Sequence, residues 1–265
     1  MNDVADDATL RVTDVTKTFG GLTAVSSASL VLAPGTVHGL IGPNGAGKST
    51  LIGIISGFIK AFAGQVHFGA RDISAFEPTA IARLALSRTF QQATPITGLT
   101  VLENVMVGMH IHYRSGAASV LFRTGAMRRE ARELEAAARR VLDEFGLADD
   151  ADRDAADLPF GKLRFLEIAR AIVMKPRILL LDEPAAGLNA VETARLEDII
   201  RAEAARGTGI LLVDHDVPFV FRLCDPVTVM NFGSVIASGP PGEVYRDKAV
   251  REAYLGTEIE QEAVT

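Results

Sequence analysis

The chain is organised around the stretch Gly42-Pro43-Asn44-Gly45-Ala46-Gly47-Lys48-Ser49-Thr50. This stretch fits the phosphate-binding pattern G-x-x-x-x-G-K-[ST]. Residues 37–41 before it are predicted to form a short buried strand, and residues 49–55 after it to begin an apolar helix. The glycines let backbone N–H groups curl towards phosphate oxygens, and the helix N-terminus adds partial positive charge. Lys48 is expected to reach the β- and γ-phosphates, and the Ser49 hydroxyl to ligate Mg²⁺. A glycine-rich turn that matches by chance is the alternative, and the strand–loop–helix context argues against it.

The composition is ordinary for a globular protein, with 48% hydrophobic and 23% charged residues among 265. The net charge of −6 argues against sequence-independent nucleic-acid binding. Cys224 is the single cysteine, so no intrachain disulfide is possible and a reducing compartment is indicated. No apolar run approaches the roughly 18–20 residues of a membrane span, and the acidic N-terminus does not resemble a signal peptide. Membrane association is therefore expected to come through a partner.

Hydrophobic periodicity and turn signals predict an α/β fold of the P-loop type, with a mainly parallel sheet, an antiparallel β part and an inserted helical lobe. Strands are predicted at residues 10–19, 28–32, 65–68, 87–90, 178–181 and 210–213, with a hairpin formed by 227–230 and 235–237. Helices are predicted at 78–86, 100–109, from 127 onwards, at 163–174 and at 189–206, with capping signals at Thr100/Glu103 and Asn189/Glu192. A turn is predicted at 69–72 and a polar linker at 149–157. The expected domain, residues 10–257, has its core at 10–91 and 176–257 and its helical lobe at 92–175, with tails at 1–9 and 258–265.

Two acidic residues, Asp182 and Glu183, follow directly after the buried strand at 178–181. Ligands of parallel sheets bind at the carboxyl ends of strands, so both carboxylates are expected to face the phosphates. Asp182 would hold Mg²⁺ directly or through water, and Glu183 would polarise the attacking water. His215 follows the next buried strand in the same way and is expected to contact the γ-phosphate. The alternatives are two solvated acids and a structural histidine. A second pair, His110 and His112, has no third ligand nearby in the sequence and is not expected to bind a metal.

With these residues in place, the chain resembles the ATP-binding subunits of ABC transporters from about Leu10 to Gly256. The resemblance lies in the phosphate loop, Gln91 in Arg88-Thr89-Phe90-Gln91, the segment Leu158-Pro159-Phe160-Gly161-Lys162, the Asp182-Glu183 pair and His215, in that order. Within that superfamily the chain is most similar to the branched-chain amino-acid importer ATPases. The features that indicate this subfamily are the segments at 166–171 and 182–189, Ala253-Tyr254-Leu255-Gly256 and the insertion from 112 to 128.

The resemblance implies roles for further residues. Phe19 would stack on adenine, although a core phenylalanine at a strand end is the alternative, and Val25 belongs to the nucleotide-binding set. Gln91 would contact Mg²⁺ or the catalytic water and sense the membrane partner, with Gln92 as the competing candidate. Gly161 would face the γ-phosphate bound by the other subunit of a head-to-tail dimer.

The chain departs from the family pattern in its signature segment, which we define as residues 158–162. Pro159 stands where serine is usual, and Lys162 where glutamine is usual. Asn189 replaces a common aspartate, and Asp214 a common glutamate. Because Pro159 offers neither a hydroxyl nor a backbone N–H, the sequence favours pairing with a second ATPase subunit whose signature is intact.

The resulting hypothesis is an ATP-hydrolysing subunit of an importer for branched-chain or related amino acids, with ATP and Mg²⁺ as its ligands. The expected partners are two permease subunits, a second ATPase subunit or a second copy of this chain, and an extracytoplasmic solute-binding protein, but no nucleic acid. The expected location is the cytoplasmic face of the cell membrane. The alternatives are the ATPase of a urea or amide importer or of lipopolysaccharide export, and, from other classes, a soluble ABC ATPase or a P-loop kinase. The soluble ABC ATPases usually have two nucleotide domains or a coiled-coil insertion, and a kinase would not need a helical lobe with a signature segment.

Overall fold

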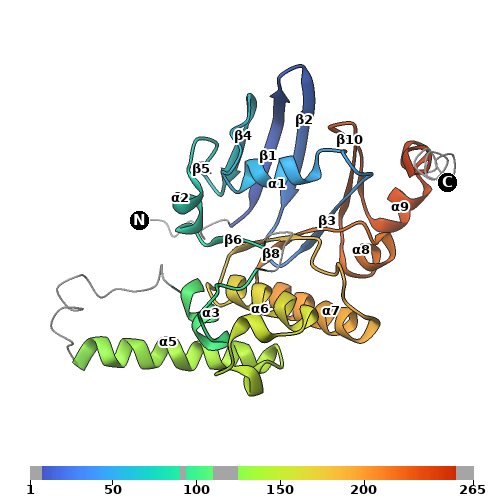
Figure 1. Cartoon of the computed structure of the whole chain (residues 1–265). Helices are drawn as coiled ribbons and strands as arrows, with labels where there is room; N and C mark the ends of the chain where they lie inside the picture. The colour runs from blue at the N-terminus through green and yellow to red at the C-terminus, as the bar shows by residue number, and fades with distance from the viewer. Residues whose placement is uncertain (1–7, 90–93, 110–124, 255–265) are drawn as a thin grey trace. The chain divides into compact units, whose positions relative to one another are not determined.

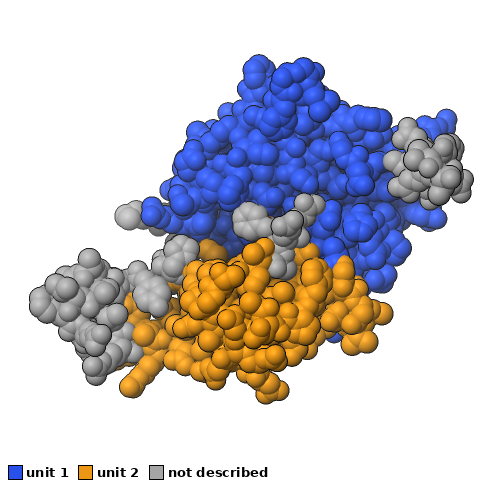
Figure 2. Space-filling view, in the orientation of Figure 1, with its two compact units in different colours: residues 1–88, 177–186, 197–265 blue, residues 89–176, 187–196 orange. Residues whose placement is uncertain are grey.

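The computed structural model describes residues 8–89, 94–109 and 125–254. Contacts divide the chain into two compact units (Figure 2). Unit 1 comprises residues 1–88, 177–186 and 197–265, and unit 2 comprises residues 89–176 and 187–196. The sequence analysis predicts the helical lobe at 92–175, whereas unit 2 runs from 89 to 176 and also includes residues 187–196.

The larger sheet of unit 1 has six strands in the order β10-β9-β3-β8-β7-β6 (Figure 1). Five strands are parallel: β3 (Val37–Ile41), β6 (Leu86–Arg88), β7 (Ile178–Asp182), β8 (Gly209–Val213) and β9 (Val227–Asn231). The edge strand β10 (Ser234–Gly239) pairs antiparallel with β9 as a hairpin. Every residue of β3, β7 and β8 is buried, as expected of central parallel strands covered on both faces. The predicted parallel sheet and hairpin are thus confirmed.

The second sheet of unit 1 is antiparallel, with the order β2-β1-β4-β5. It consists of β1 (Leu10–Phe19), β2 (Leu22–Leu32), β4 (Ala63–Phe68) and β5 (Arg71–Asp72). The strand predicted at 28–32 is too short, because pairing continues down the β1–β2 hairpin as far as Phe19 and Leu22. The turn predicted at 69–72 is partly wrong, because Arg71 and Asp72 pair with β4.

Helix α1 (Lys48–Ile55) is buried in a core that both sheets share, with Leu51, Ile52 and Ile55 fully inaccessible. Helix α2 (Pro78–Ala82) is shorter than the predicted 78–86, since Ala85 adopts a left-handed φ of 61° and the chain then enters β6. Two further helices of unit 1 are α8 (Val217–Leu223) and α9 (Pro241–Arg246), and residues 248–254 are also helical.

Unit 2 is built around α3 (Val101–Gly108), α5 (Gly125–Glu144) and α6 (Phe160–Ile172), which pack on one another. The predicted capping box is confirmed: Glu103 N donates to Thr100 Oγ1 at 3.2 Å, and Thr100 N donates to Glu103 Oε2 at 2.8 Å. Helix α6 begins three residues before the predicted Leu163. The predicted linker at 149–157 contains two short 3₁₀ helices, η2 (Ala148–Asp150) and η3 (Ala155–Asp157).

Helix α7 (Ala190–Ala205) starts in unit 2 and continues in unit 1. Its predicted cap is confirmed, because Asn189 Oδ1 accepts from Val191 N and Glu192 N at 3.0 Å each, and Asn189 N donates to Glu192 Oε2 at 2.9 Å. Of the helices in the described residues, none has both the length and the hydropathy needed to cross a bilayer.

Candidate active site

Three central strands of unit 1 end side by side. Leu40 of β3 pairs with Val213 of β8, which in turn pairs with Asp182 of β7. Because the strands are parallel, the segments that follow them leave the sheet at one edge. The phosphate loop follows β3, the His215 segment follows β8, and Glu183 follows β7. The strand order and register therefore place these three segments at the same edge of the sheet, where the sequence analysis expected them.

The phosphate loop packs so closely on neighbouring backbone that two of its glycines have no room for a side chain. A Cβ on Gly42 would lie 2.1 Å from the carbonyl oxygen of Met230, and one on Gly47 would lie 2.3 Å from that of Ala24. Gly47 also has a φ of 101° at the N-cap of α1, a conformation that favours glycine. The loop is thus held against β2 and β9 by its backbone, which leaves the N-terminus of α1 available for an anion.

Lys48 lies inside the curve of this loop and is buried. Its Nζ donates to the carbonyl oxygens of Gly42 at 2.6 Å and Pro43 at 2.9 Å. Burial lowers the pKa of Lys48, and the nearby carboxylates of Glu183 and Asp182 oppose that shift. The electrostatic coupling places the cation of the loop and the two acids in one site.

Asp182 is buried at the end of β7, and Arg88 at the end of β6 holds it in place. Arg88 Nη2 donates to Asp182 Oδ2 at 3.3 Å, and Arg88 Nη1 donates to Ser56 Oγ at 3.0 Å, next to the end of α1. Burial raises the pKa of Asp182, and Arg88 opposes the rise. The sequence analysis assigned no role to Arg88. A basic residue at the end of one parallel strand and an acid at the end of another are a signal that could have suggested this ion pair.

Glu183 has a left-handed backbone with φ of 50°, which is strained for a residue other than glycine. Its N–H donates to the carbonyl of Val213 at 2.7 Å, so the turn is fixed by the neighbouring strand. Strain that surrounding structure enforces is concentrated at functional positions. The side chain is half-buried, in keeping with a carboxylate that must reach water and nucleotide.

Asp214 and His215 follow β8 and differ in exposure. The His215 side chain is 65% exposed, and its Nδ1 lies 3.7 Å from Asp214 Oδ1. Asp214 is buried and accepts from three backbone N–H groups: those of His215 at 2.8 Å, Asp216 at 3.0 Å and Ala185 at 3.3 Å. Asp214 therefore ties the segment after Glu183 to the segment carrying His215, a role that the sequence did not suggest.

Comparison with known proteins shows the family of this chain. The "ABC transporter" family model matches residues 25–186, and a second model, "Branched-chain amino acid ATP-binding cassette transporter", matches residues 234–260. The chain belongs to the ABC transporter family. An ABC ATP-binding domain binds nucleotide, and one of the similar solved structures is in its ADP conformation.

Individual ABC relatives cover almost the whole chain. The high-affinity branched-chain amino acid transport ATP-binding protein LivG of Salmonella typhimurium is 40% identical over 93% of this chain and 97% of its own length. The corresponding BraF protein of Pseudomonas aeruginosa is 38% identical over 93% of this chain and 97% of its own length. Among solved structures, an ATP-binding cassette in its ADP conformation has a TM-score of 0.80 with 33% identity, covering 93% of this chain and 98% of its own. A nucleotide-free cassette has a TM-score of 0.79 with 32% identity, covering 92% and 98%.

The other predicted ABC nucleotide contacts lie at different depths of unit 1. Phe19, at the end of β1, is half-exposed, and Lys17 Nζ lies 5.0 Å from its ring centre. An exposed aromatic face is what stacking on adenine requires. Val25 is fully buried in the core of unit 1. Gln91 and Gln92, the candidate sensors, lie outside the described residues.

The ABC signature segment lies in unit 2, at the start of α6. Pro159 is the N-cap, and Gly161 is buried in the first turn, where an added Cβ would lie 2.2 Å from Glu192 Oε1. Lys162 Nζ pairs with Asp150 Oδ2 at 2.5 Å, which lowers the pKa of Asp150. The charge of Lys162 is thus already matched within unit 2.

The residues proposed for Mg²⁺ supply the donor chemistry that this ion prefers. Ser49 offers a hydroxyl and Asp182 a carboxylate, both hard oxygen ligands, and Mg²⁺ usually takes few protein ligands beside water and substrate phosphates. Within residues 8–89, 94–109 and 125–254 no group of three or more His, Cys, Asp or Glu side chains could hold a metal alone. The donor set therefore fits an ion shared with a nucleotide.

Proposed function

We propose that this chain is the ATP-hydrolysing subunit of an ABC importer for branched-chain or related amino acids. The observation that carries the proposal is the register Leu40–Val213–Asp182, which brings Lys48, Asp182 and Glu183 to one edge of the sheet. The printed names of the relatives and the model matching residues 234–260 support the class of solute.

In this proposal each residue has a defined task. The phosphate loop and Lys48 bind the β- and γ-phosphates, and Ser49 and Asp182 hold Mg²⁺, which supplies charge neutralisation on the phosphates when bound. Glu183 accepts a proton from the attacking water, and His215 contacts the γ-phosphate. Arg88 keeps Asp182 in place through the 3.3 Å hydrogen bond.

The proposal extends to the partners. A membrane permease pair, a solute-binding protein outside the membrane and a second ATPase subunit would complete the importer, with this chain at the cytoplasmic face. The signature segment of one subunit would close the nucleotide site of the other. Gln91 keeps its proposed role as sensor of the permease.

The test is ATP-dependent uptake by proteoliposomes that contain the complete importer. Radiolabelled leucine, isoleucine and valine should accumulate with the wild-type chain and not with Glu183→Gln. Urea or a short amide offered to the same vesicles should be taken up poorly. Uptake of urea and not of leucine would replace the proposed solute class while leaving the ATPase assignment intact.

A further inference from the structure

Gly42 opens the phosphate loop and is held from several sides. Its φ is 150°, and the carbonyl of Met230 packs where a side chain would be. Its own carbonyl accepts the hydrogen bond from Lys48 at 2.6 Å. The next segment is fixed as well, because Gly233 N donates to the Ala46 carbonyl at 3.1 Å. The conformation of this peptide therefore affects the position of Lys48.

The C-terminal helical segment, residues 248–254, reaches the same glycine. Tyr254 forms a hydrogen bond with the backbone of Gly42. This hydrogen bond lowers the pKa of the Tyr254 phenol. Burial nevertheless raises the pKa of Tyr254 to about 12, so the hydroxyl is neutral at physiological pH.

The helical segment is anchored independently of that contact. Asp247 Oδ1 accepts from Ala249 N at 2.8 Å and Val250 N at 3.2 Å, which caps the helix, and the Val250 side chain is buried. Tyr254 therefore approaches the loop from a fixed base.

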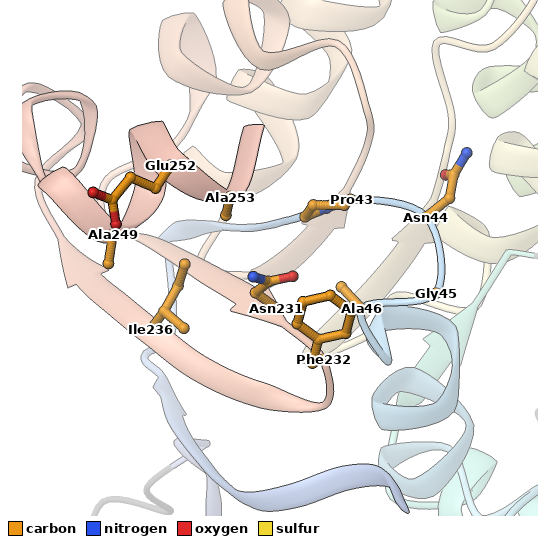
Figure 3. A pocket seen from close by; sticks show the side chains of 10 residues that line it. All are labelled: Pro43, Asn44, Gly45, Ala46, Asn231, Phe232, Ile236, Ala249, Glu252 and Ala253. Carbon is orange, nitrogen blue, oxygen red and sulfur yellow. The ribbon is translucent and has the colours of Figure 1, made fainter. Parts of the chain in front are cut away.

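A cavity of about 580 Å³ separates other parts of the helical segment from the loop. Pro43–Ala46 line it on the loop side, Ala249, Glu252 and Ala253 on the helix side, and Asn231 and Phe232 below (Figure 3). Ala249, Glu252 and Ala253 face this cavity, whereas Tyr254 forms a direct hydrogen bond from the helical segment to the loop.

We propose that Tyr254 is a positioning residue that fixes Gly42, and through it Lys48, in the conformation that binds phosphate. The backbone of Gly42 is bonded by Tyr254 and its carbonyl accepts from Lys48, so this one residue connects the C-terminal helical segment to the phosphate contact. Tyr254 lies in the C-terminal segment that the branched-chain family model matches, so this segment would help to position the phosphate loop. The inference rests on the proposed function only in taking ATP as the ligand.

The test compares Tyr254→Phe with Tyr245→Phe in the full-length chain. Tyr254→Phe removes only the hydroxyl and keeps the ring, so folding is preserved. Tyr245 is the matched control, since it is 69% exposed and contacts Phe221 edge-on at 6.3 Å. The measurements are the Kd of a fluorescent ATP analogue with Mg²⁺, and KM and kcat for ATP in the assembled transporter.

Tyr254→Phe should raise Kd and KM about three- to tenfold, because one hydrogen bond is worth about that factor, and should leave kcat within about twofold. Tyr245→Phe should behave as wild type. An unchanged Kd for Tyr254→Phe, a loss confined to kcat, or an equal effect of the control would overturn the proposal. Because Kd needs no transport, the inference stands or falls separately from the solute assignment.

Discussion

At the scale of single residues, Asp182 and Glu183 at the end of β7 have environments that suit different roles. Asp182 is buried and held by Arg88, which suits a fixed ligand, whereas Glu183 is half-buried on a strained turn, which suits a base that meets water. Lys48 lies close enough to both to be influenced by their charges. Substitutions at these positions should therefore affect different steps.

Glu183→Gln should keep nucleotide binding and lower turnover by roughly 10²–10⁴-fold, because it removes the base while keeping shape and hydrogen bonding. Lys48→Ala should instead weaken nucleotide binding, because it deletes a phosphate contact. Steady-state ATPase activity and equilibrium nucleotide binding, both measured on the assembled transporter, distinguish the two effects. Turnover near the wild-type rate in Glu183→Gln would reject Glu183 as the base.

His38 provides a pH-dependent contribution to stability. Its Nδ1–H donates to Val31 O at 3.0 Å, and its Nε2 forms a hydrogen bond with Thr228 Oγ1 at 2.8 Å. Burial lowers the pKa of His38 below the ordinary histidine value of 6.5. The unfolded chain therefore binds a proton more readily, and this contribution is lost as pH falls below that value.

The free energy of unfolding should thus fall more steeply between about pH 7.5 and pH 5.5 in wild type than in His38→Gln. Urea denaturation at several pH values measures this difference. The other four histidines and the acidic groups are common to both proteins, so they cancel in the comparison. Parallel pH curves would show that His38 does not titrate differently on folding.

The sequence predicts most residues of the candidate site, because phosphate loops and acid pairs depend on local spacing. Lys48, Ser49, Asp182 and Glu183 are each recognisable from their immediate neighbours. The roles of Arg88 and Asp214 depend on which strands lie next to each other, and a single sequence does not state strand order. The predicted end of α2 was wrong for a related reason, since the chain leaves the helix after Ala82 and pairs with β7 from Leu86 onwards.

At the scale of elements, the N-terminus of α6 and the N-terminus of α7 meet in unit 2. Gly161 faces the carboxylate of Glu192, and Glu192 closes the cap of α7 by accepting from Asn189 N. Pro159 lacks its own N–H, but as N-cap it leaves the first N–H groups of α6 unpaired by the helix. An anion can therefore still be met by backbone donors at this end.

Gly161→Ala should destabilise the chain by roughly 1–2 kcal/mol, because the new methyl displaces the Glu192 carboxylate from the cap. Glu192→Ala should cost about 1 kcal/mol by opening the cap. The double variant should cost less than the sum, since the steric conflict is then absent. A double-mutant cycle from denaturant unfolding measures the coupling, and strict additivity would show that the two groups do not interact.

At the scale of the whole molecule, the chain holds a complete set of phosphate-loop and acidic residues but a signature that begins with proline. We infer that it works beside a second ATPase with an ordinary signature. The site that uses Lys48 and Glu183 of this chain would hydrolyse ATP quickly, and the site closed by Pro159 would be slower, because losing one donor at such a site can cost on the order of a hundredfold.

Single-turnover hydrolysis in the assembled complex should lose most of its rate when Glu183 is replaced by glutamine. It should lose little when the equivalent glutamate of the second ATPase is replaced. Equal losses would show that Pro159 is tolerated and that the two sites are alike.

Helix α1, enclosed by both sheets, has a consequence for the time course of isotope exchange. The amide of Leu51 donates to Gly47 O and those after it donate to the preceding turn, and the side chains of Leu51, Ile52 and Ile55 are inaccessible, so deuterium can reach these amides only when the surrounding core opens. In heavy water, peptides covering residues 51–55 should take up label among the slowest of the chain. Their rate should follow global unfolding as denaturant is added, and nucleotide should slow it further by stabilising the native state. If residues 51–55 exchanged as fast as the exposed hairpin turn at Phe232, the core around α1 would open readily. The phosphate loop would then be attached to an unstable helix.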